Sequence, residues 1–191
     1  MSLLMAITQM DQGYLSIILG CMYSGKTSKL VSIYKHNKIA NISTCVVNYI
    51  DDNRYDNVLM STHDGRKIPC VKAKKIYDIF EKDKDLLENT KCFIINEGQF
   101  FEDLYDVVNL LVNQHKKIVY VGGLDGDFKM KKFGQILDLI PLSDKVEKLT
   151  AICSLCKKTA SFTKRIIKND EQILIGSSDM YIPVCRKCHL C

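Results

Sequence analysis

Apolar residues recur along the chain in short continuous runs that alternate with longer amphipathic stretches. Four runs rich in apolar and β-branched residues predict buried strands, at residues 14–19, 44–49, 92–95 and 117–121. Three stretches between and after them predict helices with one apolar face, at residues 26–38, 75–87 and 102–114. Strands that alternate with helices indicate an α/β fold, with a mainly parallel sheet and helices on both of its faces.

After Pro141 the pattern changes to short strands and paired cysteines. A chain of 191 residues has room for one compact domain and a small appendage, but not for two full-sized domains. We therefore expect an α/β domain at residues 1–149 and a small second domain at residues 150–191, with the boundary near Thr150.

Composition and charge narrow the class of protein. Hydrophobic residues make up 47% and charged residues 26%, which is an ordinary globular balance. No apolar run approaches the ~18–20 residues that cross a bilayer, and the N-terminus lacks the features of a secretory signal, so we expect a cytoplasmic protein with no membrane partner. Residues 153–191 carry +4 of the net charge of +5. Such a segment suits phosphate on a nucleotide or a nucleic acid, and a solvated basic face explains it equally well.

Residues 20–27, which read GCMYSGKT, fit the pattern G-x-x-x-x-G-K-[ST] between a predicted strand and a predicted helix. In this P-loop pattern, backbone N–H groups and the helix N-terminus face phosphate oxygens. We expect Lys26 to reach the β- and γ-phosphates of ATP and the Thr27 hydroxyl to bind Mg²⁺. The predicted ATP-binding residues of this loop are Gly20, Met22, Tyr23, Ser24, Gly25, Lys26 and Thr27. A chance glycine turn before a helix is the alternative.

A second group of polar residues follows the strand at residues 92–95. P-loop enzymes usually place a Mg²⁺-binding carboxylate at such a strand end, but here the first polar residue is Asn96, whose amide oxygen brings no charge. Glu97 is then the carboxylate at the strand end, and it is predicted to bind metal or to act as a general base. A solvated acid in a loop is the alternative.

Five of the nine cysteines cluster at the end of the chain. Cys153 and Cys156 form one C-x-x-C pair, and Cys185 and Cys188 form another. Four thiolates in this spacing suit tetrahedral Zn²⁺ in a closed structural site, and four free buried thiols are the alternative. His189 and Cys191 are spare donors that we expect outside the site.

The chain closely resembles the type II thymidine kinases, the family of cellular and poxviral enzymes. The motifs that carry the resemblance are GCMYSGKT, DDNRY and STHDG at residues 51–65, FIINEGQFF, GLDGDF at residues 123–128 and the two C-x-x-C turns. The resemblance implies a RecA-like domain, a zinc domain with a lasso loop, and transfer of the γ-phosphoryl group of ATP to the 5′-hydroxyl of thymidine. It also implies a homotetramer and feedback inhibition by thymidine triphosphate (dTTP).

By motif position, the resemblance makes Glu97 the catalytic base and places Arg54, with Asp52, near the phosphates or the 5′-hydroxyl. The residues implied to contact the nucleoside or hold the lasso over it are Met22, Phe100, Leu124, Phe128, Phe133, Thr163, Leu174, Ile175, Gly176 and Tyr181. Plain core packing is the alternative for the three phenylalanines.

Three positions depart from the family pattern. Asn96 stands where the family has an acid, Cys21 where it usually has proline, and Asn48 where a lysine is common in the second strand. Of these we expect only Asn96 to touch the chemistry, as a weakened Mg²⁺ ligand. Two other function classes fit the motifs: a nucleic-acid-dependent P-loop ATPase that grips with the basic zinc segment, and an inactive module that binds zinc and nucleotide.

Overall fold

The computed structural model describes residues 12–50, 59–61, 65, 67–174 and 179–191. Its main body is a six-stranded sheet in the order β5-β2-β6-β7-β1-β8, in which every neighbouring pair is parallel. The strands are β1 (Tyr14–Gly20), β2 (Thr44–Tyr49), β5 (Val71–Ala73), β6 (Cys92–Ile95), β7 (Ile118–Gly123) and β8 (Lys145–Leu149). The expected mainly parallel α/β fold is confirmed.

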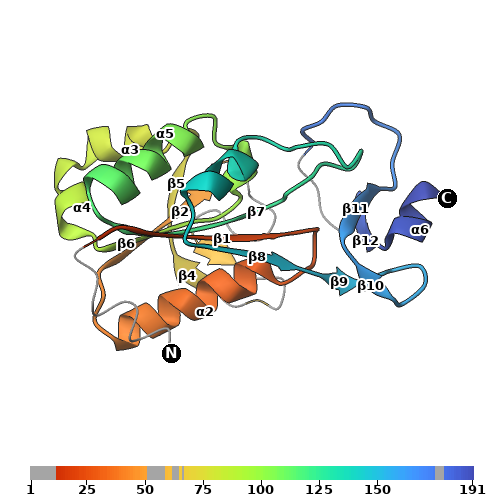
Figure 1. Ribbon diagram of the computed structural model, residues 1–191, viewed down its shortest axis with the longest axis horizontal. Coiled ribbons are helices and arrows are strands. Elements are labelled where there is room, and N and C mark those ends of the chain that lie inside the picture. The colour runs from red at the N-terminus through yellow and green to blue at the C-terminus, as the bar shows by residue number, and fades with distance from the viewer. Residues whose placement is uncertain (1–11, 51–58, 62–64, 66, 175–178) are drawn as a thin grey trace.

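Helices cover both faces of this sheet (Figure 1). On one face lie α2 (Lys26–Ile39) and the antiparallel hairpin of β3 (Leu59–Ser61) and β4 (Lys67–Pro69). On the other lie α3 (Tyr77–Lys82), α4 (Lys84–Asn89), α5 (Leu104–Asn109) with its π-helical continuation η2 (Leu110–Gln114), and the 3₁₀ helix η3 (Ile136–Leu142). None of the described helices is both long enough and apolar enough to span a bilayer.

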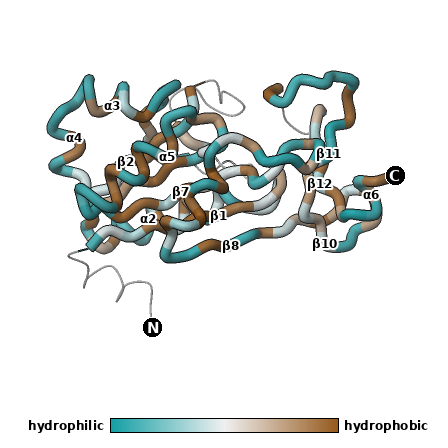
Figure 2. Tube along the Cα trace, turned by 45° about the horizontal axis from the view of Figure 1, so that its top comes forward, coloured by the Kyte–Doolittle hydropathy of each residue, from teal (hydrophilic) through white to brown (hydrophobic). Residues whose placement is uncertain are grey.

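Strand β1 shows why the core has two halves. Leu15, Ile17 and Leu19 pack into one apolar cluster with α5, whereas Ile18 packs into the other with α2. Successive side chains of a strand point to opposite faces, so a strand buried on both sides must be apolar almost throughout. Figure 2 shows this as hydrophobic colour along the central strands, with hydrophilic colour at the outer helices and loops.

The C-terminal part extends beyond one end of the sheet (Figure 1). It consists of two small antiparallel pairs and one short helix. They are β9 (Ala151–Ile152) with β10 (Thr159–Ala160), β11 (Phe162–Arg165) with β12 (Tyr181–Val184), and α6 (Arg186–Leu190). The domain boundary expected between residues 149 and 150 falls between β8 and β9 and stays a prediction.

Two predicted helices differ from the observed ones. The stretch 75–87 is two helices, because Asp83 adopts an extended conformation and its carboxylate accepts the backbone N–H of Leu86 at 3.1 Å, which caps α4. The stretch 102–114 begins as α5 and ends as the π-helix η2.

Candidate active site

The phosphate-binding loop joins β1 to the N-terminus of α2. Gly20 has φ +148°, and a side chain there would meet the carbonyl oxygen of Leu149 at 2.5 Å, so this position accepts only glycine. Lys26 is buried and its Nζ donates a hydrogen bond to the carbonyl oxygen of Cys21, 2.8 Å away across the loop. The buried Ser24 hydroxyl has no hydrogen-bond partner among the described residues. The loop thus presents a cation, a free hydroxyl and a helix N-terminus, which together suit phosphate.

Cys21 stands in this loop as a neutral thiol. Burial raises its pKa, and this effect outweighs the opposite influence of the Lys26 charge. The Sγ atom lies 3.5 Å from the carbonyl oxygen of Ala160 in β10. The cysteine therefore adds no negative charge beside a bound phosphate.

Asn96 lies directly after β6 and connects the residue that follows the phosphate-binding lysine, Thr27, to the neighbouring strand β2. The Thr27 hydroxyl donates to Asn96 Oδ1 at 3.5 Å, and Asn96 Nδ2 donates to Asn48 Oδ1 of β2 at 2.9 Å. Both asparagines are buried. Asn48 therefore contacts the predicted Mg²⁺ ligand Asn96, and our expectation that only Asn96 among the departures touches the chemistry stays a prediction.

The Thr27 and Asn96 oxygens fit a divalent cation in type, since Mg²⁺ prefers oxygen ligands. They lie at the carboxyl end of the sheet, which is where parallel α/β folds bind ligands. Thr27 and Asn96 would hold Mg²⁺ without contributing a negative charge.

Glu97 occupies a strained turn. Its φ of 55° and ψ of 42° are in the left-handed region, which non-glycine residues adopt rarely and often at functional sites. One of its carboxylate oxygens accepts a hydrogen bond from Gln99 Nε2 at 2.6 Å, and Gln99 Oε1 accepts the backbone N–H of Leu124 at 2.9 Å. Glu97 and Gln99 are both buried. The carboxylate is thus held in place, rather than solvated as an ordinary loop acid.

Aromatic rings line the region beyond Glu97. Phe100 lies between Tyr49 and Phe133, with ring centroids 5.1 and 5.5 Å away. Phe133 is buried, whereas Phe100 and Leu124 are half-buried. The structure therefore brings Phe100 and Phe133 together, which fits both a pocket wall and the alternative of core packing, and it joins Leu124 to the Glu97 turn through Gln99.

Four other residues that were predicted to contact the nucleoside or to hold the lasso form two contacts with each other. Met22 of the phosphate-binding loop donates its backbone N–H to the buried Thr163 hydroxyl at 3.0 Å. The Tyr181 hydroxyl donates to the carbonyl oxygen of Leu174 at 2.7 Å. Four predicted residues, Asp52, Arg54, Ile175 and Gly176, lie outside the described residues.

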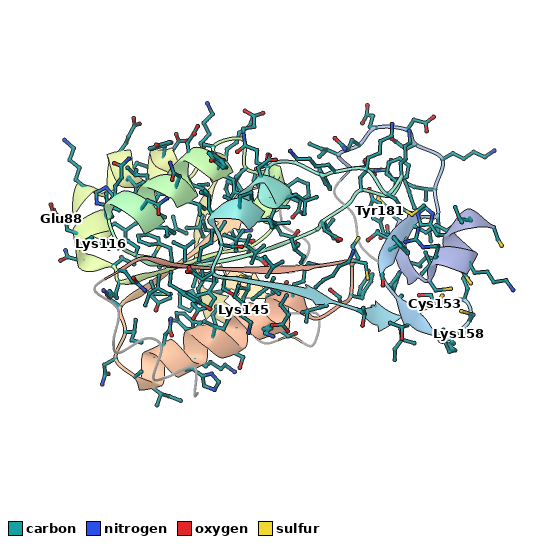
Figure 3. The ribbon with its side chains drawn as sticks, in the orientation of Figure 1. Glu88, Lys116, Lys145, Cys153, Lys158 and Tyr181 are labelled. Carbon is teal, nitrogen blue, oxygen red and sulfur yellow. The ribbon has the colours of Figure 1, made fainter. Side chains whose placement is uncertain are left out.

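The four paired cysteines converge in the C-terminal part. The Sγ atoms of Cys153, Cys156, Cys185 and Cys188 all lie within 4.8 Å of one another. A tetrahedral Zn²⁺ with Zn–S bonds of about 2.3 Å needs sulfurs about 3.8 Å apart, so the cluster fits this ion. Figure 3 labels Cys153 in this part of the molecule, far from Glu88 and Lys116.

The pKa values of the clustered thiols are shifted in both directions. Side-chain hydrogen bonds with Cys156 and Cys185 raise the pKa of Cys188 to about 12, whereas the pKa values of two other cysteines are lowered. Hydrogen bonding by the backbone N–H of Cys188 lowers the pKa of Cys185. Burial acts to raise the pKa of Cys153, but N–H groups of Cys156, Cys185 and Leu155 bring it down to about 6. His189 stands outside the four sulfurs, as expected, with Nε2 3.0 Å from the carbonyl oxygen of Phe128.

Three buried polar residues near the site were missed by sequence reasoning: Gln99, Asp127 and Arg165. Gln99 and Asp127 lie inside motifs that we had identified, but no periodicity marks a side chain that bonds across a turn. Arg165 had a detectable signal, because a strand that buries Thr163 also buries the residue two positions later.

Comparison with known proteins places these features in a family. The family described as "Thymidine kinase" matches residues 13–189, which include the loop, the Glu97 turn and all four cysteines. The chain is similar to the thymidine kinase of Sheeppox virus, with 42% identity over 94% of this chain and 98% of that protein. It is 41% identical to the vaccinia virus (strain Western Reserve) thymidine kinase and 40% identical to that of Monkeypox virus, each over 95% of this chain and 99% of the relative. A match of this extent shows that the chain belongs to the thymidine kinase family.

Proposed function

We propose that this protein is an ATP:thymidine 5′-phosphotransferase, which moves the γ-phosphoryl group of ATP to the 5′-hydroxyl of thymidine. The observation that carries the proposal is the position of Glu97, a buried carboxylate one residue from Asn96, whose side-chain oxygen faces Thr27 of the phosphate-binding loop at 3.5 Å. A base and a phosphate site at the same edge of one sheet suit phosphoryl transfer to a hydroxyl.

In the proposed reaction, Glu97 accepts the proton of the 5′-hydroxyl while that oxygen forms a bond to the γ-phosphorus. The bond between this phosphorus and the bridging oxygen breaks, and ADP leaves. Lys26 neutralises charge on the β- and γ-phosphates, and Thr27 and Asn96 would hold Mg²⁺, which supplies further neutralisation. Such catalysis depends on positioning and charge, and the turn that fixes Glu97 through Gln99 provides the positioning.

We further propose that Phe100, Leu124, Phe128 and Phe133 form a wall of the thymine pocket together with Met22, and that Tyr181 lies on the lasso side. Phe100 lies in the same turn as Glu97, to whose carbonyl oxygen its N–H donates at 3.1 Å, and its ring packs edge-on against Phe133. The resemblance supports the other finer assignments: a structural Zn²⁺ at the four cysteines, a homotetramer, feedback inhibition by dTTP, and a cytoplasmic location.

The test is to incubate the zinc-loaded protein with ATP and labelled thymidine and to look for the monophosphate. Glu97→Gln should lower kcat by about 10²–10⁴, because a positioned base contributes that much. Glu102→Gln is the matched control, since it removes an exposed acid five residues further on and should keep full activity. The proposal fails if the folded, zinc-loaded protein makes no thymidine monophosphate.

The same assay separates the competing functions. A nucleic-acid-dependent ATPase would turn over ATP faster when DNA is added and would leave thymidine unchanged. A binding module would do neither. The family match spans the basic C-terminal part as well as the phosphate-binding loop, so neither alternative is favoured.

A further inference from the structure

An arginine is buried where β11 ends, and the proposed mechanism does not use it. Arg165 is only 8% exposed and pairs with Tyr181 across the β11–β12 ladder. A guanidinium keeps its charge at any pH that a protein meets, so its burial must be compensated by hydrogen bonds or by an opposite charge. The acceptors that it has therefore reveal its role.

Arg165 donates most of its hydrogen bonds to backbone oxygens of the loop segment 169–172. Nη1 donates to the carbonyl oxygens of Asn169 and Glu171, both at 2.7 Å, and Nη2 reaches that of Gln172 at 3.4 Å. Nε and Nη2 also donate to the Tyr181 hydroxyl, at 3.1 and 2.6 Å. Within the described part of the chain, each of its acceptors is a neutral oxygen. The planar fork of the guanidinium fixes residues 169–172 relative to β11, which a single-point donor could not do.

The same guanidinium also holds two side chains of the proposed pocket. Its central carbon lies 3.7 Å from the centroid of the Phe128 ring, at cation–π distance. The Tyr181 hydroxyl, which accepts from Arg165, donates in turn to Leu174. Figure 3 shows Tyr181 close to the loop that joins β11 to β12. Arg165 therefore connects Phe128, Tyr181 and the segment 169–174 through one buried group.

A second tie joins the same segment to the turn that carries Phe128. Gln172 Nε2 donates to Asp127 Oδ2 at 2.8 Å. The other oxygen of the buried Asp127 accepts the backbone N–H groups of Lys129 and Lys131, at 2.8 and 2.9 Å. Asp127 thus fixes its own turn with one oxygen and the segment 169–174 with the other.

We propose that Arg165 is a positioning residue for nucleoside binding, and that the Asp127–Gln172 bond supports it. This inference rests on the proposed function. Arg165 contacts Phe128, Tyr181 and the segment 169–174, and it sets the shape of the thymine pocket through them. Pre-ordering a loop lowers the cost of binding, so losing Arg165 should weaken binding of thymidine. ATP binding should change much less, because the partners of Arg165 given above lie outside the phosphate-binding loop.

The main variant is Arg165→Lys, which keeps the charge and removes the fork. Arg186→Met is the matched control, because Arg186 is exposed, lies in the same C-terminal part and stacks on Phe162 instead. For Arg165→Lys we expect the KM and the calorimetric Kd for thymidine to rise about tenfold, with the KM for ATP and kcat within about threefold. Amides of residues 169–174 should exchange hydrogen faster in the unliganded variant, and Arg186→Met should match the wild type.

Gln172→Leu is a second variant that leaves Arg165 in place. Gln172 is exposed, and the change removes its side-chain hydrogen bonds to Asp127 and to the carbonyl oxygen of Lys132, at 2.8 and 3.3 Å. It should raise the thymidine KM by about threefold and speed amide exchange in the same segment. Zinc content and thermal melting check the fold of each variant.

Unchanged exchange in both variants overturns the inference, as does an equal rise in KM for ATP and thymidine. If the wild-type protein makes no thymidine monophosphate, the proposed function fails. Faster exchange in Arg165→Lys would then still support the role of Arg165 in holding the segment, and unchanged exchange would still overturn it.

Discussion

At the scale of single residues, two departures from the family pattern meet in one hydrogen bond. Asn96 Nδ2 donates to Asn48 Oδ1 at 2.9 Å, so a neutral amide pair stands where the resemblance leads us to expect an acid and a lysine. Two amides satisfy each other without a buried charge, which avoids the large desolvation cost of an ion pair. What the pair does not supply is negative charge next to Thr27.

Asn96→Asp should therefore lower the Mg²⁺ concentration that gives half-maximal rate, by about threefold or more, because a carboxylate binds this hard cation better than an amide does. The variant should fold, since the Asn48 amide can turn to donate to the new carboxylate. A titration of rate against Mg²⁺ measures the effect.

Asn113→Asp is the control for this prediction, since it adds the same charge at an exposed position of η2. Its titration curve should superimpose on that of the wild type. Identical curves for Asn96→Asp and the wild type would show that Asn96 has no part in cation binding.

Gln99→Leu tests the positioning of Glu97. The change removes the donor to Glu97 and the acceptor for the Leu124 N–H, leaving two groups unpaired in a buried place. We expect kcat to fall about tenfold or more, with a smaller change in the KM for ATP. Gln135→Leu removes a comparable bond, to the N–H of Tyr105 outside the site, and should keep kcat. Equal kcat values for the two variants would contradict the prediction.

Sequence reasoning found those residues of the candidate site that complete a recognised pattern or directly follow an apolar strand. Glu97 and Asn96 follow an apolar strand, Lys26 and Thr27 close a known loop pattern, and the four cysteines have metal-site spacing. Gln99 was missed because one of its partners, Leu124, lies 25 residues away in the sequence. Arg165 was missed because its partners lie in a loop that folds back onto β11. The strand period marks Arg165 as a residue on the buried face, but local spacing does not reveal which partners either side chain binds.

At the scale of elements, an ion pair fastens the edge strand β8 to α2. Glu147 of β8 accepts a hydrogen bond from Lys29 of α2, and this bond is the largest cause of the lowered pKa of Glu147. A carboxyl whose pKa is lower in the folded state stabilises the fold at pH values above its unfolded pKa, and loses this effect as the pH falls through the folded pKa.

Glu147→Gln should therefore reduce the free energy of unfolding near neutral pH by less than about 1 kcal/mol, because both side chains are about one-third exposed and solvent screens the pair. The difference between variant and wild type should shrink as the pH falls below about 4.3, the ordinary pKa of glutamate. Urea unfolding of both proteins across this range measures it. A difference that grows on acidification would contradict the stated sign.

Element boundaries followed from the sequence where apolar runs were continuous. β2 and β6 match the predicted ranges, and β1 extends by one residue. The edge strands β5 and β8 were not placed in the main sheet, because a strand with one neighbour is partly exposed and lacks the apolar signal. The break at Asp83 was hidden because its neighbours keep the helical spacing, while the cap depends on one side chain.

At the scale of the whole molecule, the phosphate-binding loop is attached to the C-terminal part. Cys21 Sγ contacts the carbonyl oxygen of Ala160, and the Met22 N–H bonds Thr163. β10 and β11, which carry these partners, pack with the cysteine cluster. A loss of order in the cysteine cluster should therefore also disturb the phosphate-binding loop, where ATP is expected to bind.

Removing zinc should weaken binding of an ATP analogue as well as of thymidine, each by about threefold or more, since a structural metal supplies folding energy to the elements around it. The purified protein should hold about one zinc ion per chain. Cys156→Ser should lose the metal and reproduce the effect of a chelator. Cys191→Ser, at an exposed cysteine outside the cluster, should keep both metal and affinity. Unaltered ATP affinity in a metal-free sample would show that the two parts are independent.

The position of β1 in the sheet has a consequence for biosynthesis. Its neighbours are β7 and β8, so β1 must wait for residues 118–123 and 145–149 before its backbone is fully paired. The loop that follows it packs against Leu149, the last residue of β8, and against Thr163, which emerges from the ribosome later still. Long-range pairing of this kind slows folding. A nascent chain truncated before β8 would thus carry the complete phosphate-binding motif and still be unable to grip a nucleotide.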